Sequence, residues 1–275
     1  MNEKRIKNIL KLSGICFVLI FSLVPFIWMV IISLNERPDF LLHEGFRLTV
    51  ANFVDILTMG NLHFLDYLKN SFVIASTTAL ISSLIGAVAA YAISRITFTG
   101  KTLLVLTVLA LSMFPQICIV GYLFKFMTNL GMINTYGALI LPYIAWSLPL
   151  ALWIQMSYFS RIPRELDKAA QVDGASRLQT LFKIVLPIAA PGFLSTILLL
   201  FMFCFNEFLF ALMLTADHKA RTVPVGISLF QGLHGELPWG YIMAASVISC
   251  VPVILIALIF QRRIISGLTH GAVKQ

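Results

Sequence analysis

The sequence predicts an all-α, polytopic membrane protein with six transmembrane helices and a helix–glycine–helix element on the cytoplasmic side. Three observations support this class. Hydrophobic residues make up 59% of the 275 residues and charged residues 12%, whereas soluble domains carry about 25% charged residues. Six intervals of 23 or more residues contain no charged side chain. Their apolar runs are continuous, whereas the strands of a membrane barrel would alternate between apolar and polar residues.

The uncharged intervals locate the membrane-spanning helices, because a spanning helix needs about 20 apolar residues. The first interval, between Lys11 and Glu36, holds 24 residues, which is longer than the core of a signal peptide, so we expect an uncleaved first span. The predicted spans are residues 12–34, 70–93, 102–124, 137–158, 190–216 and 240–261. One membrane domain, residues 12–261, is therefore expected between two short tails, residues 1–11 and 262–275.

The distribution of basic residues predicts the orientation. With the N-terminus inside, the inner segments hold 14 of the 20 Lys and Arg residues and the outer segments hold 6. Basic residues mark the cytoplasmic side, so both termini and residues 160–187 are expected there, in a plasma (inner) membrane protein. The net charge of +8 then reflects topology and contact with membrane lipid, and no nucleic-acid partner is predicted.

Several spans contain residues that predict bends or close packing. Pro25 in the first span is expected to bend its helix. The second span is rich in Ala, Ser and Gly, which let helix backbones approach closely, so it is expected in the middle of the bundle. Gln116, next to Pro115, indicates either a kink that lines a cavity or ordinary packing, and both interpretations stay open.

The fifth span contains Asn206 and Glu207. Glu207 lies 16 residues after Pro191, about 24 Å along a helix, which is the outer third of the membrane. An ionisable group at that depth usually faces protein or water. It is either part of a translocation pathway, together with Asn206 and Gln116, or a structural contact between helices.

Residues 160–192 form the longest polar interval in the second half of the chain. Pro163 suits the first position of a helix and Glu165 suits its positive end. Gly174 can adopt positive φ and turn the chain. A second helix is expected after it and should end at Pro187. Its apolar face would contain Leu178, Leu181, Phe182 and Val185. A connector of this size predicts a docking element for another protein.

Motifs for chemistry are lacking. The sequence has no G-x-x-x-x-G-K-[S/T] nucleotide loop, no H-E-x-x-H and no G-x-S-x-G. The four cysteines have no neighbours at metal-ligand spacing. We therefore predict no catalytic residue, no bound metal and no ATP hydrolysis by this chain alone.

The docking segment carries a specific motif. Ala169 and Ala170 are followed after three residues by Gly174, and after nine more by I-V-L-P ending at Pro187. This resembles the loop Glu-Ala-Ala, three residues, Gly, nine residues, Ile-x-Leu-Pro of permease subunits in binding-protein-dependent ABC importers, although Lys168 stands in place of the Glu. S-R-x-x-F-x-G-K, N-E-F-L-F-A-L and G-L-T-H-G-A-V-K make the whole chain similar to the shorter, six-span permease of maltose-type sugar importers, including trehalose importers.

The resemblance implies a mechanism and its partners. An external sugar-binding protein delivers a di- or oligosaccharide, two unlike permeases form the path, and two cytosolic ATPase subunits, which hold ATP and Mg²⁺, drive a rigid-body switch between two states. It assigns ATPase coupling to Glu165, Asp167, Lys168, Ala169, Ala170, Asp173 and Gly174. It assigns contact of the C-terminal tail with the ATPases to Gly267, Leu268, Thr269 and Lys274, whereas composition alone would allow a solvated tail.

Two other classes of function are weaker. An ion-coupled secondary transporter needs ionisable groups near the middle of the membrane, and only the off-centre Glu207 lies within a span. A membrane-embedded enzyme needs a convergent polar site, which the sequence does not indicate.

Overall fold

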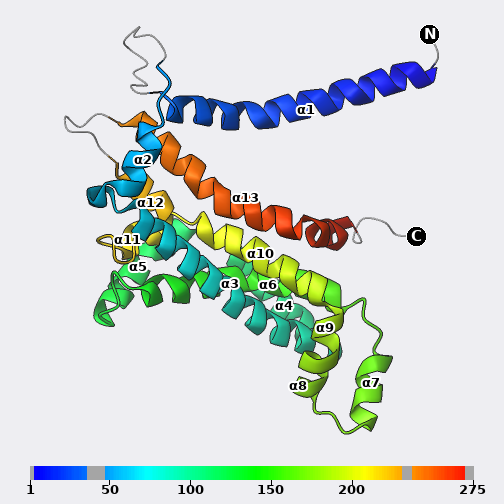
Figure 1. Ribbon diagram of the computed structural model, residues 1–275. Coiled ribbons are helices and arrows are strands. Elements are labelled where there is room, and N and C mark those ends of the chain that lie inside the picture. The colour runs from blue at the N-terminus through cyan, green and yellow to red at the C-terminus, as the bar shows by residue number, and fades with distance from the viewer. Residues whose placement is uncertain (1–2, 36–46, 231–236, 270–275) are drawn as a thin grey trace. The chain divides into compact units, whose positions relative to one another are not determined.

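The computed structural model describes residues 3–35, 47–230 and 237–269, and the side chains of 3–6, 9 and 261–269 are not considered. Within these ranges the regular structure is helical apart from one isolated bridge between Asn35 and Leu48 (Figure 1). The chain forms two compact units, Met1–Phe64 with Ile227–Val251 and Leu65–Gly226 with Pro252–Gln275. The longer helices are α1 (Glu3–Ser33), α3 (Phe64–Arg95), α4 (Lys101–Ser112), α5 (Gln116–Asn129), α6 (Tyr136–Phe159), α10 (Ala190–Phe205) and α13 (Trp239–Thr269). The shorter elements are α2 (Ala51–Thr58), η1 (Gly60–Leu62), α7 (Glu165–Val172), α8 (Arg177–Thr180), η2 (Leu181–Val185), α9 (Leu186–Ile188), α11 (Leu209–Leu214) and α12 (Val223–Ser228).

The all-α membrane class is confirmed. Four helices are long and apolar enough to cross a membrane: Leu10–Ser33, Phe64–Arg95, Tyr136–Phe159 and Trp239–Phe260. Two pairs of helices, each bent at a short break, bring the number to six if each pair is one span.

Two of the predicted spans are not single straight helices. The third is broken between Ser112 and Gln116, where α4 and α5 meet at 87°. Pro115 lies at this break because it cannot donate the backbone hydrogen bond that a continuous helix would need. The fifth, predicted over residues 190–216, ends at Phe205. After the break at residues 206–208, α11 forms a separate short helix.

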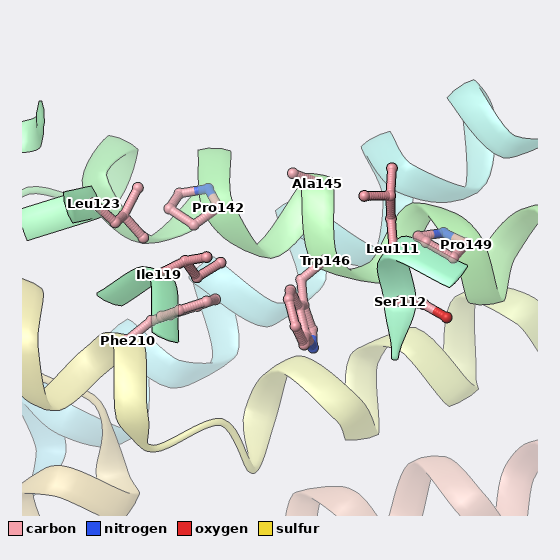
Figure 2. A pocket seen from close by; sticks show the side chains of 9 residues that line it. All are labelled: Leu111, Ser112, Ile119, Leu123, Pro142, Ala145, Trp146, Pro149 and Phe210. Atoms are coloured by element: carbon pink, nitrogen blue, oxygen red, sulfur yellow. The ribbon is translucent and has the colours of Figure 1, made fainter. Parts of the chain in front are cut away.

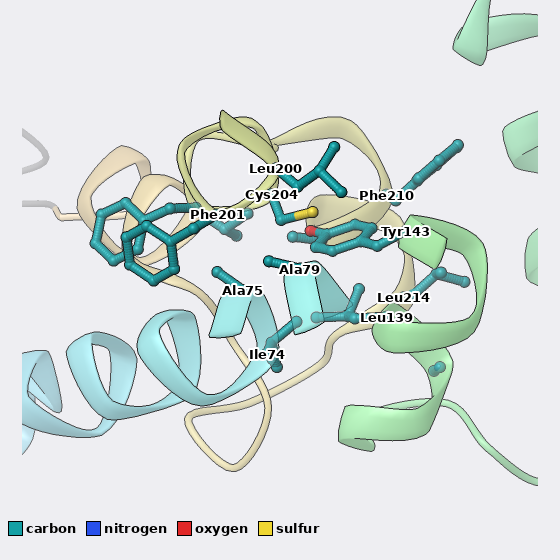
Figure 3. Close-up of a cluster of buried hydrophobic side chains, with 14 of the residues drawn as sticks. Ile74, Ala75, Ala79, Leu139, Tyr143, Leu200, Phe201, Cys204, Phe210 and Leu214 are labelled. Atoms are coloured by element: carbon teal, nitrogen blue, oxygen red, sulfur yellow. The ribbon is translucent and has the colours of Figure 1, made fainter. Parts of the chain in front are cut away.

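The core of the larger unit joins α3, α6 and α10, as the small residues of α3 predict. Ala75 and Ala79 on α3 are fully buried against a cluster that includes Tyr143, Leu200 and Phe210 (Figure 3). Further along α3, toward its C-terminal end, polar contacts fix its register against α6. The Ser147 hydroxyl donates to Ser82 Oγ at 2.8 Å, and Gln155 Nε2 donates to the Ser83 carbonyl at 2.9 Å.

The closest approach of α6 and α10 depends on Gly192. A methyl group at this position would overlap the ring of Tyr158 on α6. We expect Gly192→Ala to lower stability by about 1–3 kcal/mol through overpacking, measured as the unfolding midpoint of the purified protein in detergent. Gly121→Ala on α5 is the matched control, because nothing lies within 4 Å of its added methyl. An unchanged midpoint for Gly192→Ala would show that the two helices separate freely.

The smaller unit is organised around Asn52 on α2. Its amide donates to the carbonyls of Ser33 and Asn35, each at 2.9 Å, and so holds the end of α1. Tyr241 donates to Asp55 Oδ2 at 2.8 Å. These contacts attach α2 to the end of α1 and to the start of α13. Along α1, only 6% of the most apolar stretch is buried, which is typical of a helix that lipid or another subunit surrounds.

Candidate coupling site

The docking segment folds as two helical parts around Gly174. α7 ends in a Schellman motif: Gly174 has φ +81°, its N–H donates to Gln171 at 3.1 Å, and the Ala175 N–H donates to Ala170 at 2.9 Å. Ser176 then begins α8 with a capping box shared with Gln179. Glycine is needed because other residues rarely adopt positive φ. We call residues 165–188 the coupling element.

The limits of these helices differ from the prediction. α7 begins at Glu165, two residues after Pro163, with Arg164 as its N-cap. The second part does not end at Pro187. It continues to Ile188 through the π-helical turn η2, and the chain bends by 85° before α10. Pro187 has no backbone N–H to donate, and the wider π-helical turn before it lets the helix continue without that hydrogen bond.

The coupling element has a buried and an exposed face. Leu181 and Val185 are fully buried in a cluster with α3 and α6. Leu178 and Phe182, predicted for the same face, are instead 58% and 45% exposed. Val172 is 87% exposed. Apolar side chains at the tip of a loop, flanked by charges, are typical of a surface that another protein covers.

Two of the predicted coupling residues point inward. Ala170 is 3% and Asp167 6% exposed. Tyr91 Oη donates to Asp167 Oδ1 at 2.8 Å, and Arg95 Nε lies 3.1 Å from Asp167 Oδ2. Arg95 also donates to the Ile162 carbonyl at 3.0 Å. We call Tyr91, Arg95 and Asp167 the α3 clamp, since it fastens α7 to the end of α3.

The other five predicted coupling residues share the exposed surface. Their contact with an ATPase remains a prediction. They are Glu165, Lys168, Ala169, Asp173 and Gly174. Of the tail residues, Gly267, Leu268 and Thr269 belong to the last turn of α13, and Lys274 lies outside the described residues.

Glu207 performs a structural task. Its carboxylate accepts hydrogen bonds from the backbone N–H groups of Phe210, at 2.8 Å, and Ala211, at 3.2 Å, and so caps α11. Tyr143 Oη donates to the same carboxylate at 2.6 Å. Glu207 is 8% exposed. The carboxylate thus stabilises the restart of the helix after the break, and its place in a translocation pathway stays a prediction.

The remaining pathway candidates lie apart from this cap. Asn206 is exposed and donates to the Met202 carbonyl at 2.8 Å. Gln116 is half-buried at the start of α5. Near the α4–α5 break is an apolar hollow of about 260 Å³, in which the rings of Trp146 and Phe210 meet edge to face (Figure 2). Gln116 does not line it. The lining residues are Leu111, Ser112, Ile119, Leu123, Pro142, Ala145, Trp146, Pro149 and Phe210.

At the other end of α3, polar side chains hold the segment after α11. Asn70 Nδ2 donates to the carbonyls of His218, at 2.8 Å, and Arg221, at 2.9 Å. The Val223 N–H donates to Ser71 Oγ at 2.8 Å. Asn134, with φ +63°, accepts from the Ala216 N–H. The sequence did not indicate the roles of these residues, nor those of Tyr91 and Arg95 in the α3 clamp. The only available signal was that polar residues begin and end an apolar span.

Asn134 lowers the pKa of Asp217. Its side-chain amide donates to Asp217 Oδ1, and the Lys219 N–H donates to the same oxygen, each at 2.8 Å. Both bonds favour the carboxylate. Because the folded pKa lies below the unfolded one, the stabilisation is present above the unfolded pKa and is lost as the pH falls through the folded value.

We therefore expect the amides of residues 216–219 to exchange with deuterium faster, relative to their intrinsic rates, as the pH falls below about 4. In Asp217→Ala, exchange should be fast already at neutral pH and show no such step. An identical pH profile in the two proteins would contradict a role for this carboxylate.

The fold is that of a polytopic membrane protein, with four to six helices among the described residues that could cross a membrane. Residues 82–270 match the family described as the binding-protein-dependent transport system inner membrane component, and the chain belongs to this family. It is thus an ABC importer permease, a class that the comparisons favour over a secondary transporter.

Individual relatives cover nearly the whole chain. It is 56% identical to the trehalose/maltose transport system permease protein MalG of Thermococcus litoralis, over 100% of this chain and 99% of that protein. It is 41% identical to the trehalose transport system permease protein SugB of Mycobacterium tuberculosis, over 92% and 93%. A bacterial ABC transporter that imports the acidic polysaccharide alginate has the same fold, with a TM-score of 0.77 and 19% identity over 95% of this chain and 98% of that chain.

Proposed function

We propose that this chain is one of two unlike permeases in an ABC importer for a di- or oligosaccharide such as trehalose or maltose. The observation that carries the proposal is the exposed coupling element with its left-handed Gly174. The names of the relatives support the substrate class, because the chain is 56% identical over its full length to a trehalose/maltose permease and 41% identical to a trehalose permease.

The proposed partners follow from the same assignment. Two ATPase subunits cover the exposed face of the coupling element and hold ATP and Mg²⁺, so this chain has no catalytic residue of its own. Both termini lie in the cytoplasm, and a sugar-binding protein docks on the opposite side. Closing of the ATPases carries the coupling element with it and switches the path from inward to outward facing. ATP hydrolysis thus takes place outside the membrane.

The decisive experiment is reconstitution of the two permeases and the ATPase in vesicles, with the binding protein and labelled trehalose or maltose outside. We expect uptake only with ATP in the compartment that contains the ATPases. If neither sugar enters, a panel of labelled mono- and oligosaccharides tested for binding to the binding protein would correct the substrate. If this chain accumulates sugar without the ATPase, the ion-coupled alternative is right and the proposal is wrong.

A further inference from the structure

The buried face of the coupling element is attached to α3 by groups that lie outside the Ala-Ala-Gly motif. Tyr91 and Arg95 are four residues apart on α3 and therefore share one face. Both reach the same carboxylate, with one partner for each oxygen of Asp167. Tyr91 donates a hydrogen bond to one oxygen, and the Arg95 guanidinium forms an ion pair with the other, so the clamp holds α7 on the end of α3.

Two further contacts hold the link that leads from α6 into α7. Arg95 donates to the Ile162 carbonyl at 3.0 Å. Arg164 donates to the Ser94 carbonyl at 3.2 Å, at the last turn of α3. A helix C-terminus has carbonyls without partners and a negative end, and a guanidinium satisfies both. Contacts with α3 thus hold the link at Ile162 and Arg164, and α7 itself at Asp167. A rotation of α7 alone would break them, so α7 and α3 are expected to move together.

Burial of the ion pair indicates that its main effect is on geometry. The side chains of Arg95 and Asp167 are 9% and 8% exposed. A buried ion pair adds little net stability, because desolvation of both charges offsets their attraction, but losing one partner leaves an uncompensated charge. An apolar contact could bind the two helices as well. The hydrogen bonds from Tyr91 to Asp167 and from Arg95 to the Ile162 carbonyl are directional, and with the ion pair they restrict the relative orientation of α7 and α3.

We propose that Tyr91 and Arg95 are positioning residues for ATP-driven transport: through Asp167 they fix the coupling element to α3, so that displacement of α7 moves α3 by the same amount. Asp167 thus serves coupling from inside this chain rather than by touching the ATPase. The inference rests on the proposed function, since it concerns how force from the ATPase reaches the membrane helices. No group of the partner subunits is needed in the clamp.

The test uses the complete complex with both permeases, the ATPase and the binding protein. Sugar uptake and ATP hydrolysis are measured in the same vesicles for Arg95→Met, Asp167→Asn and the double variant. In each, we expect the sugar transported per ATP to fall by about tenfold, within the usual range of coupling between sites, while hydrolysis per assembled complex stays within about twofold. A merely structural role would lower the amount of complex and leave this ratio unchanged.

The double variant keeps the test valid if a single variant fails to assemble. It leaves no unpaired buried charge, so it should assemble better than Arg95→Met and should still be uncoupled. Arg95→Lys, which keeps the charge, should recover part of the coupling. Arg161→Met is the matched control, because Arg161 is exposed and contacts the Tyr158 ring rather than the clamp.

The outcomes separate this inference from the proposed function. If the wild-type complex shows no ATP-driven uptake, the proposed function fails. If the wild type transports and the double variant transports as much sugar per ATP, the clamp is not a positioning device and the inference is wrong.

Discussion

Gly174→Pro is expected to abolish ATP-driven uptake while the protein still inserts into the membrane. Gly174 has φ +81°, whereas proline fixes φ near −65°. Proline also removes the N–H that donates to Gln171. The turn between α7 and α8 must therefore refold, which displaces the exposed face that we assign to the ATPase. Uptake by reconstituted complexes should fall below about a tenth of the wild-type rate.

Gly100→Pro is the matched control for this variant. Gly100 also has positive φ, +87°, and also has open space around an added Cβ. It lies outside the coupling element, in the loop between α3 and α4. At equal amounts of inserted protein, Gly100→Pro should retain uptake. Normal uptake by Gly174→Pro would remove the coupling element from the mechanism.

Glu207→Ala should lower the stability of the folded protein by more than about 3 kcal/mol. The substitution removes three hydrogen bonds to a charged group, each worth about 1.5–3 kcal/mol. It also leaves the hydroxyl of Tyr143 and the N–H groups of Phe210 and Ala211 without their acceptor. The unfolding midpoint in detergent, or the half-life of folded protein at fixed temperature, measures the loss.

Two further variants give a graded comparison. Tyr143→Phe removes only one of the three bonds and should cost about 1.5–3 kcal/mol, less than Glu207→Ala. Asn206→Ala alters an exposed neighbour and should change stability by at most about 0.5 kcal/mol. If Glu207→Ala is as stable as the wild type but transports no sugar, the carboxylate acts in the pathway and not as a helix cap.

The membrane class could be predicted because it depends on properties that are averaged over long segments of the sequence. Charge-free length and small-residue content are averages over 20 or more positions, so single errors do not matter. They placed the second span correctly in the core, and Ala75 and Ala79 are indeed fully buried. The breaks were harder, because a proline such as Pro115 gives a kink or a complete interruption depending on whether neighbouring helices pack against both halves.

The candidate site could be predicted only where one residue type is enough to indicate the backbone conformation. Gly174 was found because positive φ favours glycine. The orientation of the coupling helices does not follow from the sequence. Leu178 and Phe182 are predicted for the buried face, yet both are exposed. The π-helical turn over Leu181–Val185 changes the angular spacing at Phe182, whereas Leu178 precedes this turn and nothing in the structure explains its exposure. Asp167 was grouped with surface residues because its partners, Tyr91 and Arg95, are more than 70 positions away.

The polar attachments at both ends of α3 have a consequence for communication across the bilayer. α3 contains 32 residues, about 48 Å of helix, and exceeds the thickness of the hydrocarbon core, about 30 Å. Its clamp holds one end, and Asn70 holds the backbone at His218 and Arg221 at the other. A long helix that is held at both ends transmits a displacement of either end to the other. In the proposed importer, if binding of ATP to the partner subunits changes the affinity for solute at the outer end of α3, binding of solute there changes the affinity for ATP by the same factor.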